Sequence, residues 1–245
     1  MLDTNAVVAS AVNASVRRAS PTVAIVGGEI GPHNGGSPPC NHTSMRWAVF
    51  GDSLWYADAM GSKAANGYDS FCRQDLIGAD YGLLDCATAE PLPDYYTALL
   101  WTKTMGRTAF DVDAVAGGGG AAATVRVYAH CTAAAESAGG AAAGSLTVLA
   151  INLANESATL RLSSVGDVAR AHVLEGDADA RASLTGVGGL LGTGAKLNGS
   201  PLRAAADGTP PELTPATDLG REVTLPPTSL AWLVVPGAAR KECGE

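Results

Sequence analysis

The sequence predicts an α/β part over residues 1–110 and an all-β part over residues 111–245. Up to residue 110, segments with apolar residues at helical spacing alternate with short apolar runs, in the order helix, strand, helix, strand, helix. After residue 110 the pattern changes to short β-prone runs separated by Gly, Pro and Asp, without a helical period. These observations indicate a parallel α/β structure followed by a β-sandwich.

Three helices and two strands are expected in the first part. In chain order they fall within residues 4–19, 22–26, 46–64, 67–78 and 92–106. The first helix is predicted because Val8, Val12 and Val16 recur every four residues. The first strand, TVAIV, is apolar throughout and is therefore expected to be buried on both faces. Pro93 and Gly106 mark the start and the end of the third helix.

Six β-prone runs are expected to form the strands of the second part. They are TVRVYAHC, SLTVLAINLA, TLRL, ARAHVLE, REVTL and SLAWLVV. His130 and His172 fall within these runs and are expected to be structural. No repeat of 20 to 50 residues is visible.

Composition excludes several classes of protein. The formal net charge is −8, and no basic stripe suggests a nucleic-acid partner or an anionic membrane surface. The longest apolar runs are shorter than the roughly 20 residues that a membrane-spanning helix needs. The N-terminus lacks the basic start and continuous apolar stretch of a signal peptide. The sequence is therefore either cytoplasmic or a chain that begins partway through a longer one.

Cysteines and glycosylation sequons favour the second alternative over a cytoplasmic protein. They indicate that the longer chain belongs to the secretory pathway. The five cysteines form no C-x-x-C pair, which argues against a zinc ribbon, and one or two disulfides would fit an oxidising compartment. Four asparagines are candidate glycosylation acceptors: Asn13, Asn41, Asn155 and Asn198. The expected location is extracellular, the cell wall, or a lysosome or vacuole. No cofactor and no metal site is expected.

The run IVGGEIGPHNGG contains the candidate catalytic residue. A short apolar run ends in two glycines, and Glu29 follows before a loop rich in Gly, Pro and Asn. A carboxylate at the C-terminal end of a parallel strand is where barrel enzymes carry their catalysts, whereas spacing alone favours a charged residue in a turn. His33, in the same loop, has no partner spaced to form a site with it and is interpreted as a loop histidine.

An ordered set of motifs decides between these alternatives. GEIGPHNGG, CRQDLIGADYGLLD and PLPDYYTALLWTKTMG, followed by RVYAHCT, LTVLAINL and KLNGSPL, resemble the C-terminal half of the heparanase-like glycoside hydrolases (glycoside hydrolase family 79). These are retaining glycosidases with a (β/α)8 barrel and an appended β-sandwich. The resemblance implies that residues 1–110 are the C-terminal units of an incomplete barrel and that residues 111–245 are the sandwich.

The resemblance also implies roles for individual residues. Glu29 matches the nucleophile, and Gly35 and Gly36 match paired glycines whose backbone approaches the sugar acid. Gln74 matches an amide that faces the substrate, and Tyr81 matches a tyrosine near the sugar. The implied substrate is a glycan or proteoglycan with β-linked uronic acids.

Family members also bridge the cysteines that correspond to Cys131 and Cys243, so the same disulfide is implied here. Cys40, Cys72 and Cys86 remain as an odd set, with Cys72 expected to be buried in a barrel strand and the other two in loops.

One half of the retaining machinery is missing from the sequence. Retaining chemistry needs a second carboxylic acid about 5 to 5.5 Å from the nucleophile, to protonate the leaving oxygen. In the resembled family this is a glutamate well upstream, whereas the 28 residues before Glu29 contain no glutamate. We therefore expect a heparanase-like glycosidase chain that lacks its acid/base and whose partner is the missing N-terminal part of the barrel. The alternative is a non-catalytic carbohydrate-binding or structural β-sandwich protein with a vestigial barrel.

Overall fold

The computed structural model describes residues 2–32, 47–112, 124–134, 136, 143–162, 165–177 and 189–243. These residues include the helices α1 (Leu2–Ala19), α2 (Phe50–Ala65) and α3 (Pro93–Thr104). Two short strands, β1 (Val26–Ile30) and β2 (Ser70–Arg73), pair in parallel. The order α1, β1, α2, β2, α3 confirms the order predicted for the first part. Within the described residues, no helix is long and apolar enough to cross a membrane.

The remaining strands are antiparallel and form two sheets. A large sheet contains β3 (Met105–Phe110), β4 (Val125–Thr132), β5 (Leu146–Asn152), β7 (Val168–Asp177), β8 (Gly194–Leu197), β9 (Ser200–Pro201), β10 (Ala216–Gly220) and β12 (Ser229–Val235). Its order is β3-β4-β5-β12-β7-β8-β9, and β10 also pairs with β7. A two-stranded ribbon contains β6 (Ala158–Arg161) and β11 (Glu222–Leu225).

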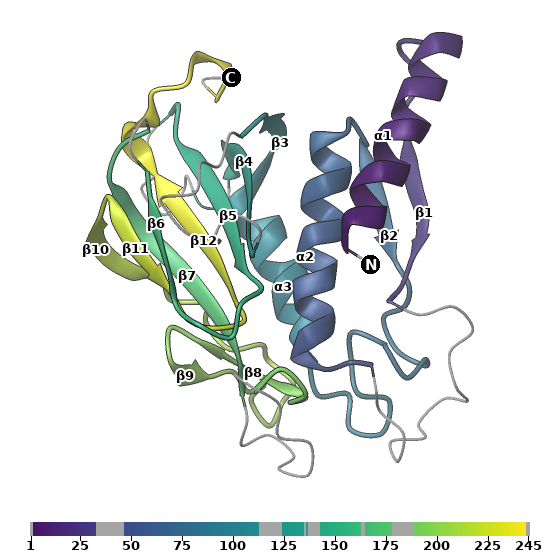
Figure 1. Cartoon of the computed structure of the whole chain (residues 1–245). Coiled ribbons are helices and arrows are strands. Elements are labelled where there is room, and N and C mark those ends of the chain that lie inside the picture. The colour runs from purple at the N-terminus through teal and green to yellow at the C-terminus, as the bar shows by residue number, and fades with distance from the viewer. Residues whose placement is uncertain are drawn as a thin grey trace.

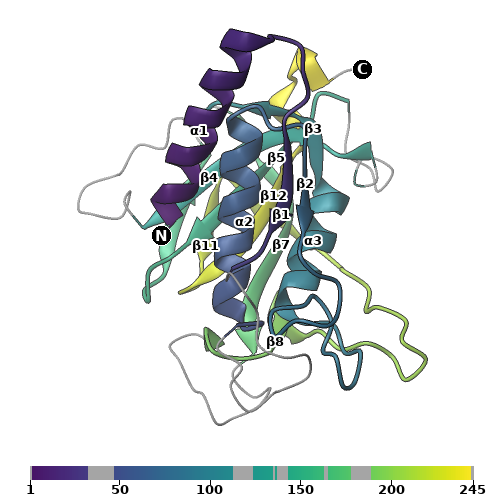
Figure 2. The same cartoon turned by 90° about the vertical axis from the view of Figure 1, so that its right-hand side faces the viewer.

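The elements are stacked in layers, with the large sheet in the interior (Figure 1). The β6–β11 ribbon lies on one face of the large sheet, and α2 and α3 cover the other face. Helix α1 and the β1–β2 pair lie outside these two helices, farthest from the sheet (Figure 2). The parallel pair is therefore an outer layer of the molecule.

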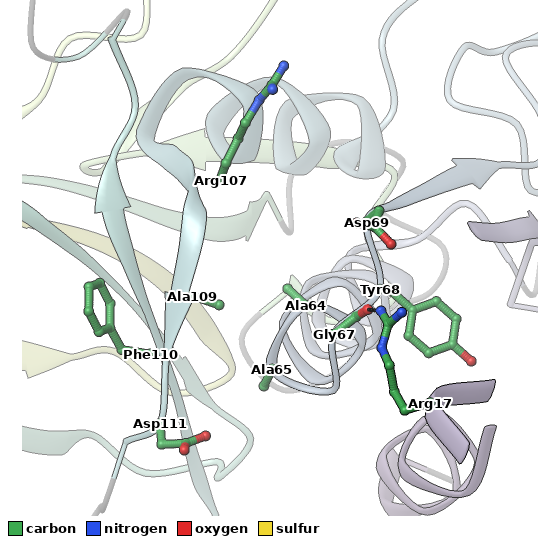
Figure 3. A pocket seen from close by; sticks show the side chains of 10 residues that line it. All are labelled: Arg17, Ala64, Ala65, Gly67, Tyr68, Asp69, Arg107, Ala109, Phe110 and Asp111. Carbon is green, nitrogen blue, oxygen red and sulfur yellow. Dashed lines mark hydrogen bonds between the residues drawn. The ribbon is translucent and has the colours of Figure 1, made fainter. Parts of the chain in front are cut away.

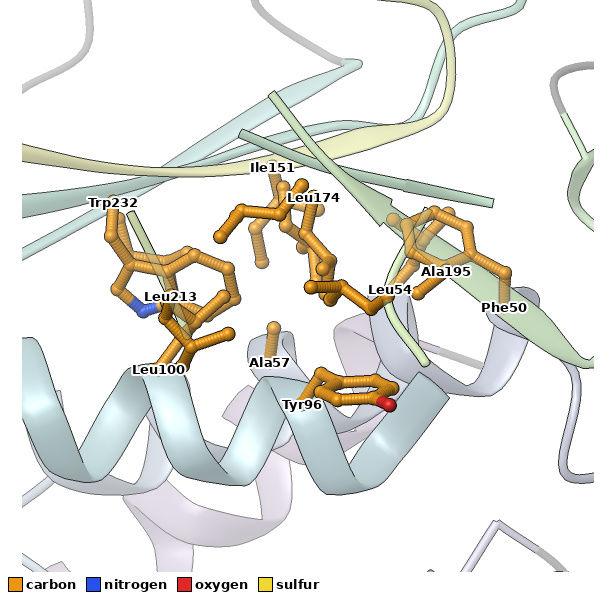
Figure 4. Packing of buried hydrophobic residues seen from close by; sticks show 14 of the residues in the cluster. Phe50, Leu54, Ala57, Tyr96, Leu100, Ile151, Leu174, Ala195, Leu213 and Trp232 are labelled. Carbon is orange, nitrogen blue, oxygen red and sulfur yellow. The ribbon is translucent and has the colours of Figure 1, made fainter. Parts of the chain in front are cut away.

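Two apolar clusters hold the layers together. In the first, Leu54 of α2 and Leu100 of α3 pack against Ile151, Leu174 and Trp232 of the large sheet (Figure 4). The second lies on the other face of the sheet and includes Val223 and Leu225 of the ribbon. Its buried members are Ala129, Val148, Ala150, Leu162, Val168, Ala171, Val223, Leu225, Ala231, Leu233 and Val235. Because the central strands supply side chains to both clusters, β5 and β12 are buried along their whole length.

The prediction of a first strand buried on both faces is wrong in two respects. The strand covers Val26–Ile30, not residues 22–26, and Val23 and Val26 are 47% and 53% exposed. Cys72, which was expected to be buried in β2, is also exposed. The reason is that β1 pairs only with β2, and no described element covers the face of this pair that points away from the helices.

The disulfide between Cys131 and Cys243 is confirmed. Their Cα atoms lie 5.2 Å apart, and the bond joins the end of β4 to the C-terminal turn η5 (Lys241–Cys243). The same turn is held to the chain before β5, because the amide of Gly144 donates to the carbonyl of Cys243. Cys86 is also disulfide-bonded, so it is not part of an unpaired set, and Cys40 lies outside the described residues.

Helix α2 approaches the large sheet closely at Gly61, which has no side chain. Gly61 of α2 faces the ring of Tyr128 in β4, and a Cβ at residue 61 would lie 2.3 to 2.6 Å from three ring atoms. The ring cannot easily withdraw, because its hydroxyl donates to the buried carboxylate of Asp58 at 2.7 Å. Arg126 also pairs with Asp58, at 3.3 Å.

The substitution Gly61→Ala is therefore expected to destabilise the protein by about 1–3 kcal/mol or more, because overpacking outweighs the better helix propensity of alanine. Urea unfolding followed by fluorescence measures the change. Gly237→Ala is the matched control, since a Cβ at residue 237 meets no atom within 4 Å. Equal unfolding free energies for the two variants would contradict the contact.

Candidate active site

Glu29 lies at the C-terminal end of β1, on the exposed side of the β1–β2 pair. Gly27 pairs with Phe71 and Ile30 pairs with Arg73, so β1 advances by one residue more than β2 and contains a bulge. Ile30 is 7% exposed, whereas Glu29 is exposed. Bulges re-aim side chains next to active sites, and beside this one Glu29 is exposed while Ile30 is buried.

The two glycines before Glu29 are not equivalent. A Cβ on Gly27 would lie 3.0 Å from Ile30 Cδ1 and 3.2 Å from Phe71 Cβ, so a side chain there would press on both neighbours. A Cβ on Gly28 would meet nothing within 4 Å. Packing between β1 and β2 therefore requires only the first glycine.

Gln74 and Tyr81 follow β2 and lie near the end of β1. The backbone amide of Gln74 donates to the carbonyl of Ile30 at 2.9 Å, which extends the pairing of the two strands beside Glu29. Tyr81 is 3% exposed, and its carbonyl accepts a hydrogen bond from Arg73 Nη2 at 2.9 Å. The loop between them is closed by Asp75, whose carboxylate accepts from the amide of Ala79.

The electrostatics of Tyr81 connect it to Glu29. Burial raises the pKa of the Tyr81 hydroxyl, and the negative charges of Asp75, Asp80 and Glu29 raise this pKa further, against the opposing effect of Arg73. The charge of Glu29 therefore acts on Tyr81. Asp75 and Asp80 were missed by sequence reasoning; the signal available was two aspartates within the run QDLIGADYG.

Arg73 supports this region from the interior. Its side chain is 4% exposed and pairs at 2.7 Å with Asp94, at the start of α3. The guanidinium carbon lies 5.3 to 6.0 Å from the ring centres of Trp55, Tyr56 and Tyr81. Burial raises the pKa of Asp94, whereas Arg73 and a hydrogen bond from Ser53 lower it.

Several predicted residues cannot be placed. Gly35 and Gly36 lie outside the described residues, as do His33 and Asn41. No group of three or more His, Cys, Asp or Glu side chains suitable for a metal is found among the described residues.

A pocket of about 770 Å³ lies beside the residues that precede β2, whereas Glu29 is near the C-terminal end of β1. Figure 3 shows the residues that line this pocket. Tyr68 and Asp69, which precede β2, line it together with Arg107 and Asp111 on the β3 side. Arg17 also lines it, but this side chain donates to the carbonyls of residues 21, 23 and 67 and so links α1 to its neighbours. Catalytic sites of parallel α/β folds lie at the carboxyl ends of the strands, so this pocket is not the candidate site.

Comparisons with known proteins give related sequences over most of the chain. Heparanase-like protein 2 of Arabidopsis thaliana is 28% identical over 262 residues, covering 92% of this chain and 43% of that protein. Baicalin-beta-D-glucuronidase of Scutellaria baicalensis is 30% identical over 226 residues, covering 90% and 37%. Inactive heparanase-2 of Homo sapiens is 29% identical over 200 residues, covering 78% and 32%.

A solved structure supports the fold alone. The crystal structure of a conserved exported protein from Bacteroides fragilis matches 96% of this chain and 43% of that chain, with a TM-score of 0.54 at 8% identity. No protein-family model matches the sequence. The curated relatives are nevertheless consistent with one another, and the chain spans less than half of their length. By sequence, this chain is a homologue of the heparanase-like glycoside hydrolases.

Proposed function

We propose that the chain carries the nucleophile of a retaining glycosidase that acts on glycans with β-linked uronic acids. The observation that supports this most is the position of Glu29, which lies at the carboxyl end of a parallel strand, exposed beside a bulge and next to Gln74. The charge of Glu29 also acts on the buried Tyr81. A uronic acid is supported by the relatives, one of which is named as a β-D-glucuronidase.

Each residue has a defined task in the proposed reaction. A carboxylate oxygen of Glu29 attacks the anomeric carbon, the bond from this carbon to the leaving oxygen breaks, and the leaving group departs with the electron pair. Gln74 and Tyr81 hydrogen-bond the sugar, and Gly35 and Gly36 are the residues assigned to its carboxylate. The proton for the leaving oxygen comes from an acid that this chain does not supply.

The proposed architecture is a (β/α)8 barrel in which β1 and β2 are two of the eight strands, followed by a β-sandwich. The exposed face of the β1–β2 pair, with Val26, Glu29 and Cys72, would then line the barrel interior. A two-stranded parallel sheet is unusual alone, because parallel sheets are normally covered on both faces. The proposed partner is the N-terminal part of the barrel, and the match of this chain to only 43% and 37% of two relatives is consistent with a longer protein.

The experiment uses a substrate whose leaving group needs no proton. With 2,4-dinitrophenyl β-glucuronide, residues 1–245 should release a burst of about one dinitrophenolate per protein and retain a glucuronyl group on the peptide that contains Glu29. Turnover of an oligosaccharide should be undetectable, because general acid catalysis typically contributes 10²–10⁴-fold. Azide should speed release of the trapped sugar, and a β-configured glucuronyl azide would identify a retaining mechanism.

Glu29→Gln is expected to abolish the burst and the labelled peptide, because an amide is not a nucleophile. Glu222→Gln, an exposed glutamate in β11, is the control and should leave both unchanged. Absence of any burst in the unsubstituted protein would reject the nucleophile assignment for this chain. It would support the second candidate, a non-catalytic carbohydrate-binding protein, which is favoured by the similarity to a relative named as inactive.

A further inference from the structure

The sequons of this chain differ sharply in their structural surroundings. Three of the four sequon asparagines lie within the described residues: Asn13, Asn155 and Asn198. A glycan attached to the side-chain nitrogen of an asparagine needs that nitrogen to be free of structural hydrogen bonds and open to solvent. The three sites can therefore be compared by the contacts and exposure of the amide itself.

The amide of Asn198 is part of the fold. It lies in the turn between β8 and β9, with a φ of 49°. Its Oδ1 accepts a hydrogen bond from the amide of Val173 at 2.9 Å, and its Nδ2 donates to the carbonyls of Thr214 at 2.9 Å and Ala171 at 3.3 Å. A sugar on Nδ2 would break these bonds, which hold the hairpin against β7.

Asn13 is also unsuitable, for a different reason. It lies in the interior of α1, where the side chain is half-buried and its Oδ1 is buried without a hydrogen-bond partner. Its side-chain amide lies beside Gly67, two residues after the end of α2, because a Cβ on Gly67 would be 3.4 Å from Asn13 Oδ1. A glycan at this position would separate the two helices.

Asn155 lies on an exposed turn that is held by hydrogen bonds of the Asn152 side chain. The turn joins β5 to β6, and Asn155, Glu156 and Ser157 are all exposed. The buried side chain of Asn152 fixes its base: Nδ2 donates to the carbonyls of Glu156 and Pro226, at 2.8 and 2.7 Å, and Oδ1 accepts from the amide of Ala154. The turn is therefore rigid at its base while the sequon at its tip is open.

We propose that Asn155 carries an N-linked glycan and that Asn13 and Asn198 remain unmodified. In this reaction Nδ2 of Asn155 bonds to the anomeric carbon of a sugar held on a lipid pyrophosphate, the bond from this carbon to the pyrophosphate oxygen breaks, and the amide loses one proton. The donor class is found in the secretory pathway. The Cys131–Cys243 disulfide and the bonded Cys86 agree with that oxidising environment.

The proposed site is compatible with the rest of the molecule. Asn155 precedes β6, which belongs to the ribbon on the face of the large sheet away from α2 and α3. The β1–β2 pair with Glu29 lies on the other side of those helices. A glycan on the turn therefore need not cover the candidate active site, and the proposal does not depend on the proposed function.

The test removes each sequon without touching its asparagine. Residues 1–245 are secreted from a eukaryotic cell behind a cleavable signal peptide, and tryptic peptides are analysed before and after enzymatic deglycosylation. A glycan is expected on the peptide that contains Asn155, and Ser157→Ala should remove it completely. Ser15→Ala and Ser200→Ala, which destroy the sequons of Asn13 and Asn198, should leave the glycan pattern unchanged.

The controls separate folding from modification. Ser15, Ser157 and Ser200 are all exposed, so each alanine variant should be secreted at the level of the unsubstituted protein. An unmodified Asn155 in the secreted protein would overturn the proposal. A glycan on Asn198 or Asn13 in that folded material would overturn it equally, because it would show that the observed contacts do not exclude the sugar.

Discussion

The double variant Cys131→Ala/Cys243→Ala is expected to lose about 4 to 5 kcal/mol of unfolding free energy. The bridge joins residues separated by 112 positions, and closing a loop of that length removes much of the conformational entropy of the unfolded chain. Loss of native contacts around the bridge is expected to contribute less to this free-energy change. The strand β4, in which Cys131 is buried, remains paired with β5 in the variant. Urea unfolding at matched pH measures the loss.

Substitution is a better test than reduction, because a reducing agent would also open the disulfide of Cys86. Cys72→Ala is the matched control, since Cys72 is a free and exposed cysteine. It should change the unfolding free energy by less than about 0.5 kcal/mol. A loss below about 1 kcal/mol in the double variant would show that the C-terminal turn does not constrain the unfolded chain.

The helices were predictable because local sequence specifies them. Four-residue spacing of valines marks α1, and Pro93 lies in the first turn of α3. The strands that were missed depend on distant partners. β3 follows α3 with no intervening loop, and its residues 105–110 include Gly106, which was interpreted only as a helix end. A Cβ on Gly106 would lie 2.5 Å from the carbonyl oxygen of Cys131, so this glycine is required by the pairing of β3 with β4.

β8, β9 and β10 were missed for the same kind of reason. They are short or polar, and they depend on distant partners: β8 and β10 pair with β7, which extends to Asp177, and β9 pairs with β8. The turn between β8 and β9 was visible as Asn198-Gly199, a pair typical of tight hairpins, and both residues have positive φ. The quoted motif KLNGSPL thus contained a hairpin signal that was used only as a family match.

The candidate site was predictable as a set of residues but not as a geometry. Motifs indicated Glu29, Gln74 and Tyr81, yet the bulge that exposes Glu29 depends on the register of β1 against β2, which no local pattern reveals. Burial of the first strand was predicted from its apolar composition, because apolar runs are typical of covered strands. Val26 is nevertheless 53% exposed, because none of the described residues covers that face of the strand.

Asp52, in the first turn of α2, is expected to contribute less to the stability of the protein as pH rises from about 4 to 7. Its side chain is buried and accepts a hydrogen bond from the amide of Ala48 at 2.6 Å. Burial, and then the negative charge of Asp94, raise the pKa of Asp52 from 3.8 to about 7, although Arg73 and the backbone amides of Ala48 and Val49 oppose the shift. The carboxyl group is therefore neutral in the folded protein over much of this range.

The sign of the pH dependence follows from proton binding. Between pH 4 and 7 the folded state keeps the proton of Asp52 and the unfolded state has released it, so unfolding releases a proton and stability falls by about 1.4 kcal/mol per pH unit. Over three units this amounts to about 4 kcal/mol at most. Asp52→Asn keeps an oxygen that can accept from Ala48 but cannot ionise, so it should match the parent near pH 4 and exceed it increasingly up to pH 7.

Unfolding free energies of parent and variant, measured in urea at intervals between pH 4 and 8, decide the point. Asp94 and Arg73 remain in both proteins, so the difference between the two curves isolates residue 52. Asp207→Asn provides a control of opposite sign, because hydrogen bonds from the backbone amide and hydroxyl of Thr209 lower the pKa of this exposed carboxylate. Parallel curves for the parent and Asp52→Asn would show that Asp52 is ionised in the folded protein. In that case Arg73, which pairs with Asp94 and whose positive charge also acts on Asp52, must stabilise both negative charges.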